Sequence, residues 1–216
     1  MRRHSPAIFL TIAAVALGAA ACGDDDDAAS SSAAGKPEPV AQVDQLSGKS
    51  TAVALDAGFA DALKSLELTP APVGDASISK AGVASFPITG GNVKYYKPGS
   101  VSPFVQGEID HDGAGLSLTG GGTKVELTDF VVDPGASVLT GKVSVDGKVA
   151  AESAPLFFLD GRTLKPLEAS SDGTAVLEGT TVKLKAEAAD LLNQTFKVDA
   201  LQEGLVIGVA KITINT

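Results

Sequence analysis

Several residue types that carry chemistry are scarce in this chain of 216 residues. It has no tryptophan, one cysteine and two histidines, His4 and His111. A single cysteine excludes an internal disulfide and a thiolate-rich metal site, and so few histidines exclude a zinc site built from several imidazoles. The formal net charge is −9, whereas binding to nucleic acid needs clusters of lysine and arginine. We therefore expect no nucleic-acid partner.

The first 21 residues have the pattern of an export signal. Arg2 and Arg3 precede an apolar run from Ile8 to Leu17, which is too short to span a membrane. Small residues then precede Cys22, as in a bacterial lipobox. The segment is either a plain signal peptide or a lipoprotein signal, after which Cys22 carries lipid. We favour the lipoprotein, which predicts attachment to the membrane through the lipid anchor and an extracytoplasmic location at the cell surface.

Composition divides the rest of the chain into a linker and a domain. After Cys22 the text "GDDDDAASSSAAG" and its continuation to residue 49 contain few large apolar side chains, which is typical of a disordered tether. Residues 50–216 are numerous enough for one well-cored domain. The predicted parts are a signal peptide over 1–21, a lipidated cysteine and linker over 22–49, and a β-rich domain over 50–216.

Local patterns within the domain predict strands and a short helix. Many valine, threonine and leucine residues favour β structure. Asp146-Gly147 lies between alternating apolar residues and predicts a two-residue hairpin, and Asp160-Gly161 repeats the pattern. The residues "DHDGAG" predict a turn between two strands. Asp56 predicts the cap of a helix over 57–66, with apolar side chains on one face.

Two segments far apart in the chain resemble each other. The text "TAVALDAGFADAL" (51–63) shares seven of thirteen positions with "TTVKLKAEAADLL" (180–192), and "GVASFPI" (82–88) resembles "GVAKITI" (208–214). Convergent amphipathic patterning is the alternative to a true internal repeat. We predict a mainly β fold, an antiparallel β-sandwich or partly open barrel, with two short helices in pseudo-repeated strand–helix–strand units.

One short segment holds most of the side chains that could bind a ligand. Tyr95 and Tyr96 are the two tyrosines of the chain, and His111 follows within "DHDG". A tyrosinate oxygen can ligate haem iron, and a nearby histidine can support that ligand or bind the iron itself. The alternative is that they are ordinary strand residues, because adjacent tyrosines on a strand point to opposite faces. The carboxylates of Asp110 and Asp112 predict a protonated His111.

Catalytic motifs do not stand out in the sequence. No serine lies in a G-x-S-x-G elbow, and the glycine-rich segments "GGNVKYYKPG" and "TGGGTK" match neither a P-loop nor a dinucleotide fingerprint. His111 is also the single imidazole beyond the first few residues. We therefore expect a binding or structural protein rather than an enzyme, without a metal site.

Two stretches and one helix resemble a known family. They are "FPITGGNV", "VQGEIDHDGAGLSLTGGGTKVELTDFVVDPGASVLTGKVSVDGK" and the helix at Phe59, and they resemble the HtaA domain of actinobacterial haem-uptake proteins. That family shows a strand ending in a histidine-glycine element, here "DHDGAGLSL", followed by an aspartate- or asparagine-proline dipeptide, here Asp133-Pro134. The resemblance is strongest over residues 82–148. It implies surface display, a β-rich fold with two helices, and haem held by a tyrosine with a supporting histidine.

Compared residue by residue, the resemblance places His111 in the position of the supporting histidine. The family's ligand tyrosine lies near the first helix, where this chain has "GFADALKSL", so Tyr95 and Tyr96 are the available iron ligands. The expected function is that of an exported lipoprotein that binds haem, or proteins that carry haem, at the cell surface. The alternative is a structural or adhesive module of the cell envelope without a small-molecule ligand.

Overall fold

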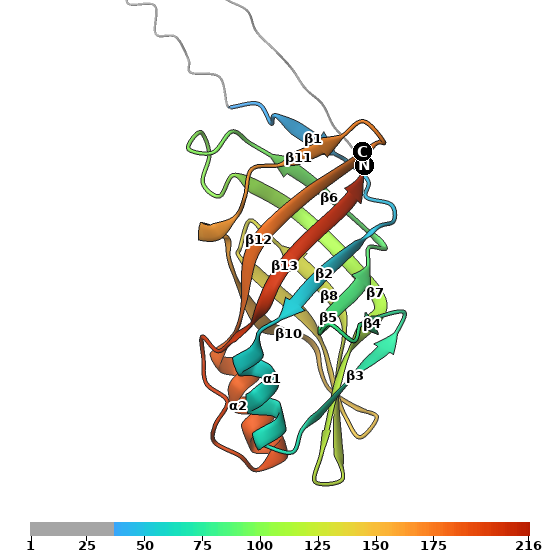
Figure 1. Cartoon of the computed structure of the whole chain (residues 1–216), viewed down its shortest axis with the longest axis vertical. Coiled ribbons are helices and arrows are strands. Elements are labelled where there is room, and N and C mark those ends of the chain that lie inside the picture. The colour runs from blue at the N-terminus through green and yellow to red at the C-terminus, as the bar shows by residue number, and fades with distance from the viewer. Residues whose placement is uncertain (1–36) are drawn as a thin grey trace, which may run out of the picture. The chain divides into compact units, whose positions relative to one another are not determined.

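A computed structural model describes residues 37–216, which form one compact unit (Figure 1). The predicted export signal and Cys22 lie outside the described residues. The elements, in chain order, are β1 (Ala41–Val43), β2 (Ser50–Leu55), α1 (Ala57–Ser65), β3 (Thr69–Gly74), β4 (Ser77–Ile78), β5 (Val83–Pro87), β6 (Gly90–Tyr95), β7 (Val105–Gly120), β8 (Thr123–Asp133), β9 (Val138–Val145), β10 (Lys148–Asp160), the 3₁₀ turn η1 (Gly161–Thr163), β11 (Glu168–Ser170), β12 (Thr174–Leu184), α2 (Ala186–Phe196) and β13 (Val206–Asn215).

The strands form one antiparallel sheet that curls into a half barrel. Its order is β1-β6-β7-β8-β9-β10-β12-β13-β2-β5-β4, with β3 added to β7 and β11 added to β12. Between β5 and β6 the chain crosses from one wall to the other. Ile88 N still donates to Lys49 O beside β2 (2.9 Å), whereas Thr89 N donates to Asp110 O on β7 (2.9 Å). The predicted class, a mainly antiparallel β fold with two short helices and a partly open barrel, is confirmed.

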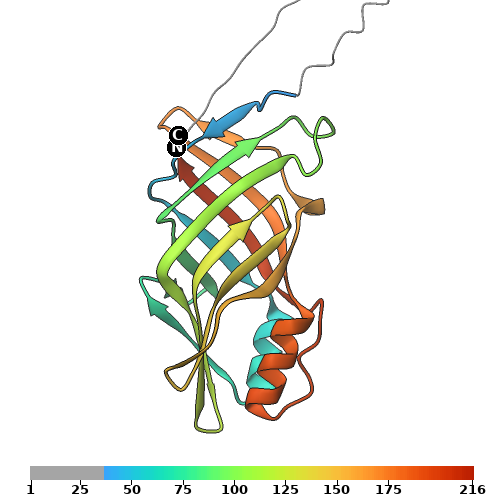
Figure 2. The same cartoon turned by 180° about the vertical axis from the view of Figure 1, so that it is seen from behind.

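Both helices lie at the end of the molecule away from the C-terminus (Figures 1 and 2). Helix α1 begins where expected, because the Asp56 carboxylate accepts from Gly58 N (2.8 Å) and Phe59 N (3.3 Å). It buries Leu63, and α2 buries Leu192 on its inner face. None of the helices within residues 37–216 combines the length and the apolar character needed to cross a membrane.

The two similar sequence segments occupy equivalent places in the fold. One copy comprises β2, α1 and, after a longer connection, β5; the other comprises β12, α2 and β13. Strand β13 pairs with both β12 and β2, so the two copies lie side by side in the sheet. Thr51 and Thr180, which match in the sequence comparison, begin the equivalent stretches of β2 and β12. The predicted strand–helix–strand unit is present twice.

Residues 37–49 are part of the folded domain rather than of a linker. Strand β1 pairs with β6, and Leu46 is 2% exposed within the hydrophobic core. The composition of this stretch is mostly polar and small, so it did not indicate that its single leucine, Leu46, packs into the core. The ordered domain therefore begins before residue 50, the boundary predicted from composition.

Two of the three predicted turns differ from the structure. Asp146 and Gly147 adopt positive φ angles of 48° and 77° and join β9 to β10, as the hairpin signal indicates. Asp160 instead caps the 3₁₀ turn η1, so Asp160-Gly161 is not a tight hairpin. The "DHDG" segment lies inside the single long strand β7, where a bulge replaces the expected turn.

Candidate functional site

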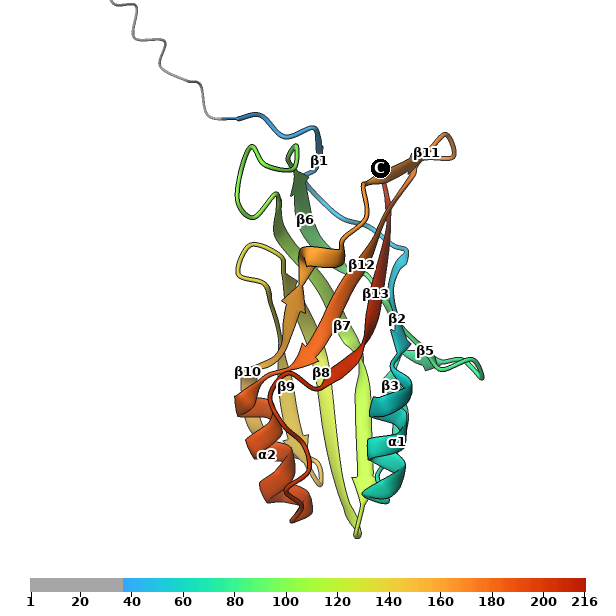
Figure 3. The same cartoon turned by 60° about the vertical axis from the view of Figure 1, so that its left-hand side comes forward.

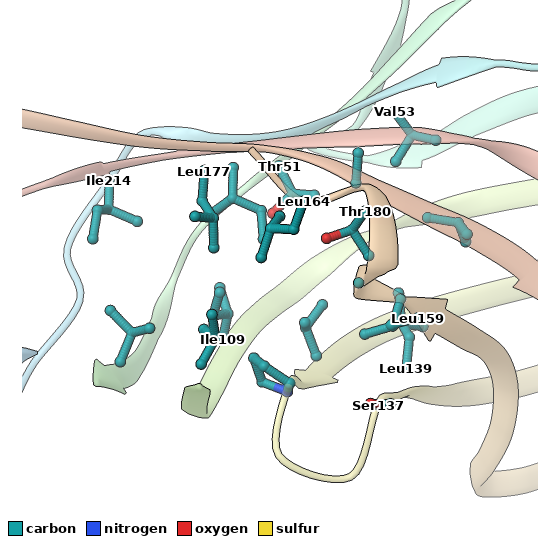
Figure 4. A pocket seen from close by; sticks show the side chains of 18 of the residues that line it. Thr51, Val53, Ile109, Ser137, Leu139, Leu159, Leu164, Leu177, Thr180 and Ile214 are labelled. Carbon is teal, nitrogen blue, oxygen red and sulfur yellow. The ribbon is translucent and has the colours of Figure 1, made fainter. Parts of the chain in front are cut away.

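An apolar cavity of about 520 Å³ lies between the two walls of the half barrel (Figure 4). Strands β12, β13, β2 and β5 form one wall, and β6 to β10 form the other. Side chains alternate along each strand, so every second residue faces inward. Those inward residues are mainly aliphatic, and the chain has no tryptophan to fill the space between them. Figure 4 shows aliphatic side chains from opposite walls facing one another across the cavity, including Val53, Ile109, Leu139, Leu177 and Ile214.

His111 joins both walls on the cavity side of the core. Its Nδ1 lies 2.8 Å from the carbonyl oxygen of Pro87 at the end of β5, and its Nε2 lies 3.1 Å from Thr51 Oγ1 on β2. A carbonyl can only accept, so Nδ1 carries a proton; in the neutral ring Nε2 then accepts from the Thr51 hydroxyl. The ring packs edge-on near Phe86, with 6.2 Å between centroids. His111 thus links the two walls of the half barrel with two hydrogen bonds.

The protonation expected for His111 from its neighbours in the sequence is wrong. The side chain is 2% exposed, and this burial lowers the pKa of His111 below its ordinary value of 6.5. The hydrogen bond to Pro87 and the charges of Asp110 and Asp112 raise the pKa, but burial outweighs them. His111 is therefore neutral at pH 7.

The two tyrosines occupy different environments. Tyr95 is buried and lines the cavity, with its ring edge-on to Phe104 at 5.8 Å. Tyr96 is also buried but does not line the cavity, as expected for the opposite face of the strand. Tyr95 pairs with Val105, and His111 follows six residues later on β7, up to about 20 Å along the strand. Tyr95 and His111 share one cavity but lie at different depths in it.

A charged cluster lies at the mouth of the cavity. Arg162 donates to both carboxylate oxygens of Asp160, from Nε at 2.8 Å and from Nη2 at 2.6 Å. Lys183 Nζ donates to the same carboxylate at 2.8 Å. These bonds, with Arg162 first, lower the pKa of the Asp160 carboxyl well below its usual range. The carboxylate therefore stays ionised and fixes the position of the guanidinium.

Three residues of the site were not identified from the sequence. Thr51 and Thr180 place hydroxyl groups on the inner wall (Figure 4). Arg162 lines the cavity and is largely exposed. The matched threonines of the two similar segments carry a usable signal, since both are polar residues at inward positions of predicted strands. The sequence around Arg162 contains no pattern that sets it apart from the other arginine and lysine residues at the surface. Within residues 37–216, no three His, Cys, Asp or Glu side chains come together as a metal site.

Comparison with solved structures relates this arrangement to a known domain. The C-terminal domain of HtaA from Corynebacterium glutamicum superposes with a TM-score of 0.54 at 15% sequence identity, covering 81% of this chain and 98% of that one. The domain has an HtaA-like fold. A domain-swapped dimer variant of the same Corynebacterium glutamicum domain aligns with a TM-score of 0.45 at 13% identity, covering 74% of this chain and 92% of that one.

At the level of sequence, the comparisons give no relative. No family model matches the chain, and neither does any curated protein. The HtaA-like assignment therefore concerns the fold, and it agrees with the motifs around His111 from which the resemblance was inferred.

Proposed function

We propose that this HtaA-like domain binds haem in the apolar cavity and is displayed at the cell surface by a lipid on Cys22. The cavity is the observation that carries the proposal. Its volume of about 520 Å³ lies in the range of small-molecule sites, and its lining combines many apolar groups with a few polar ones, as such sites do. The proposed partners are haem itself or proteins that carry haem. Attachment to the membrane rests on the signal pattern before Cys22.

The residues of the cavity suit a porphyrin in two respects. Aliphatic and aromatic side chains face each other from opposite walls, which suits a flat apolar ring (Figure 4). Tyr95 offers a phenol on the wall of the cavity, and a tyrosinate can ligate haem iron. Tyr95 lies on β6 opposite Val105, and His111 lies six residues further along β7, which is too far for both side chains to bind one iron atom. We therefore assign iron ligation to Tyr95, with His111 and Thr51 as a polar contact for the ligand deeper in the cavity.

Replacing Tyr95 by phenylalanine is expected to weaken hemin binding by about tenfold or more, because supporting changes around a metal already lower affinity 10- to 100-fold. The measurement is a titration of the purified chain with hemin, followed by the Soret absorbance. Tyr96→Phe is the matched control: it removes the same hydroxyl from the next residue, which does not line the cavity. We expect the Tyr96→Phe titration to coincide with that of the unchanged chain.

Two outcomes contradict the proposal at different levels. Equal weakening by Tyr95→Phe and Tyr96→Phe would remove Tyr95 as the ligand while leaving the cavity as the site. A Soret band that stays that of free hemin throughout the titration of the unchanged chain would remove haem as the ligand and favour a structural or adhesive module of the cell envelope.

A further inference from the structure

The cavity opens where β10 parts from β12. The two strands pair only between Phe157–Asp160 and Thr181–Leu184, whereas β12 continues to Thr174 at its other end (Figure 3). Phe158 and Arg162 lie at this place, and both line the cavity while being 44% and 82% exposed. Arg162 follows Asp160, the last residue of β10 that pairs with β12, so its exposed side chain lies where the strands part. Arg162 therefore marks the mouth.

The charged group at the mouth keeps hydrogen-bond donors for a ligand. Arg162 uses Nε and one Nη2 proton on Asp160, and a guanidinium has five N–H donors. The remaining three make no hydrogen bond to the part of the chain that the structure describes. Lys183 pairs with the same carboxylate. Asp160, Arg162 and Lys183 together therefore carry a net charge of +1. The mouth is cationic, and Asp160 holds the guanidinium in place.

The mouth carries charged side chains, whereas the deeper part of the cavity is lined by uncharged ones. Among the described side chains that line it, Asp160 and Arg162 are the only charged ones, since His111 is neutral. Apolar residues cover most of the remaining wall. A ligand that fits both regions has an apolar body for the interior and an anionic group that stays at the entrance.

We propose that the mouth binds the carboxylate of an amphipathic ligand, with Arg162 donating to it and the apolar lining of the cavity holding the rest of the ligand. The ligand class is an apolar body with a terminal carboxylate, such as a porphyrin carboxylic acid or a long-chain fatty acid. The inference rests on the proposed function in one respect, because the body of the ligand occupies the same cavity. It requires no iron and no contribution from Tyr95.

The test compares acids with their neutral esters, using iron-free fluorescent probes. One pair is protoporphyrin IX and its dimethyl ester, and the other is the polyene fatty acid cis-parinaric acid and its methyl ester. Each is titrated into the purified chain and followed by probe fluorescence. We expect at least one acid to bind about fivefold more tightly than its ester, the effect of one solvent-exposed charge pair. The pair that responds identifies the source of the carboxylate.

Substitutions at the mouth assign this preference to one residue. Arg162→Gln is expected to bring the affinity for the acid down to that for the ester, without changing the ester. Arg162→Lys keeps the charge and is expected to retain part of the preference. Lys165→Gln is the matched control: Lys165 lies three residues further on and is exposed, but it pairs with Glu178 and does not line the cavity. We expect it to bind both probes as the unchanged chain does.

Several results would overturn the carboxylate site. Equal affinities for acid and ester, an equal effect of Lys165→Gln and Arg162→Gln, or no binding of either acid each contradict it. These results are separable from a failure of the haem proposal, because a chain that leaves the Soret band of hemin unchanged can still bind a fatty acid through Arg162. Conversely, if Arg162→Gln changes neither the affinity for hemin nor the affinity for the acid probes, the haem proposal stands and the mouth site is removed.

Discussion

Replacing Gly107 by alanine is expected to destabilise the domain by about 3 kcal/mol or more, because backbone strain and overpacking each cost about 1–3 kcal/mol. Gly107 has a φ of +123°, and a Cβ placed there would lie 2.2 Å from the carbonyl oxygen of Asn92 on β6. That oxygen belongs to a backbone held in the sheet, so it cannot move aside. The measurement is the midpoint of urea unfolding.

Gly161→Ala provides the control for Gly107→Ala. Gly161 has no positive φ, and a Cβ there meets no atom within 4 Å. Its unfolding midpoint should match that of the unchanged chain. If Gly107→Ala also unfolds within about 0.5 kcal/mol of the unchanged chain, as ordinary surface substitutions do, then β6 and β7 are not packed as closely as described. The register that brings Tyr95 and His111 onto the same wall would then be wrong.

Acidification is expected to destabilise the domain through His111. Burial holds the pKa of His111 below 6.5 in the folded state, so the unfolded chain takes up the proton first as the pH falls. Stability from this residue is present above about pH 6.5 and is lost as the pH falls through the folded pKa, by up to about 1.4 kcal/mol per pH unit. The measurement is the free energy of unfolding in urea between pH 7 and pH 5.

His111→Gln separates this effect from the titration of other groups. Glutamine can hydrogen-bond but takes up no proton in this range, so the variant keeps every pH effect except that of His111. We expect the unchanged chain to be more stable at pH 7 and the difference between the two to narrow towards pH 5. A difference that stays constant, or widens, over this range contradicts a neutral, buried His111.

Local signals in the sequence predicted the local structure well. Asp56 can cap a helix through contacts two and three residues away, and Asp146-Gly147 closes a hairpin within its own two residues. Both depend on neighbouring residues alone. The alternation of strand residues likewise predicts that Tyr95 and Tyr96 face opposite sides, but it does not indicate which of them faces the cavity. That choice depends on how β6 packs against the rest of the barrel.

The segment around His111 shows why longer-range features were not predictable. Aspartate and glycine tolerate turns and bulges equally well, and the bulge prevails because β7 pairs with β6 before it and with β3 after it. Asp129 then accepts from Gly113 N at 2.9 Å across the bulge. The pKa of His111 follows from the same packing, because neighbouring charges are visible in the sequence and burial is not.

The cavity itself depends on the distance between two walls formed by distant parts of the chain. Thr51 and His111, sixty residues apart, meet across it at 3.1 Å, and Arg162 reaches its mouth because pairing between β10 and β12 stops at Asp160. Neither the contact between Thr51 and His111 nor the end of the β10–β12 pairing produces a periodic pattern in the sequence from which it could be predicted. The resemblance through "DHDGAGLSL" did predict the fold, since a family motif carries long-range information that propensity lacks.

The claim that the cavity holds the ligand is tested most directly by filling it. Thr180 points into the cavity (Figure 4), so Thr180→Phe should block it with a ring. Thr213 lies between two lining residues of β13 and does not line the cavity itself, so Thr213→Phe places the same ring on the opposite face of the sheet. In a hemin titration followed by the Soret band, we predict that Thr180→Phe abolishes binding and that Thr213→Phe binds like the unchanged chain. Undiminished hemin binding by a folded Thr180→Phe chain would contradict the account.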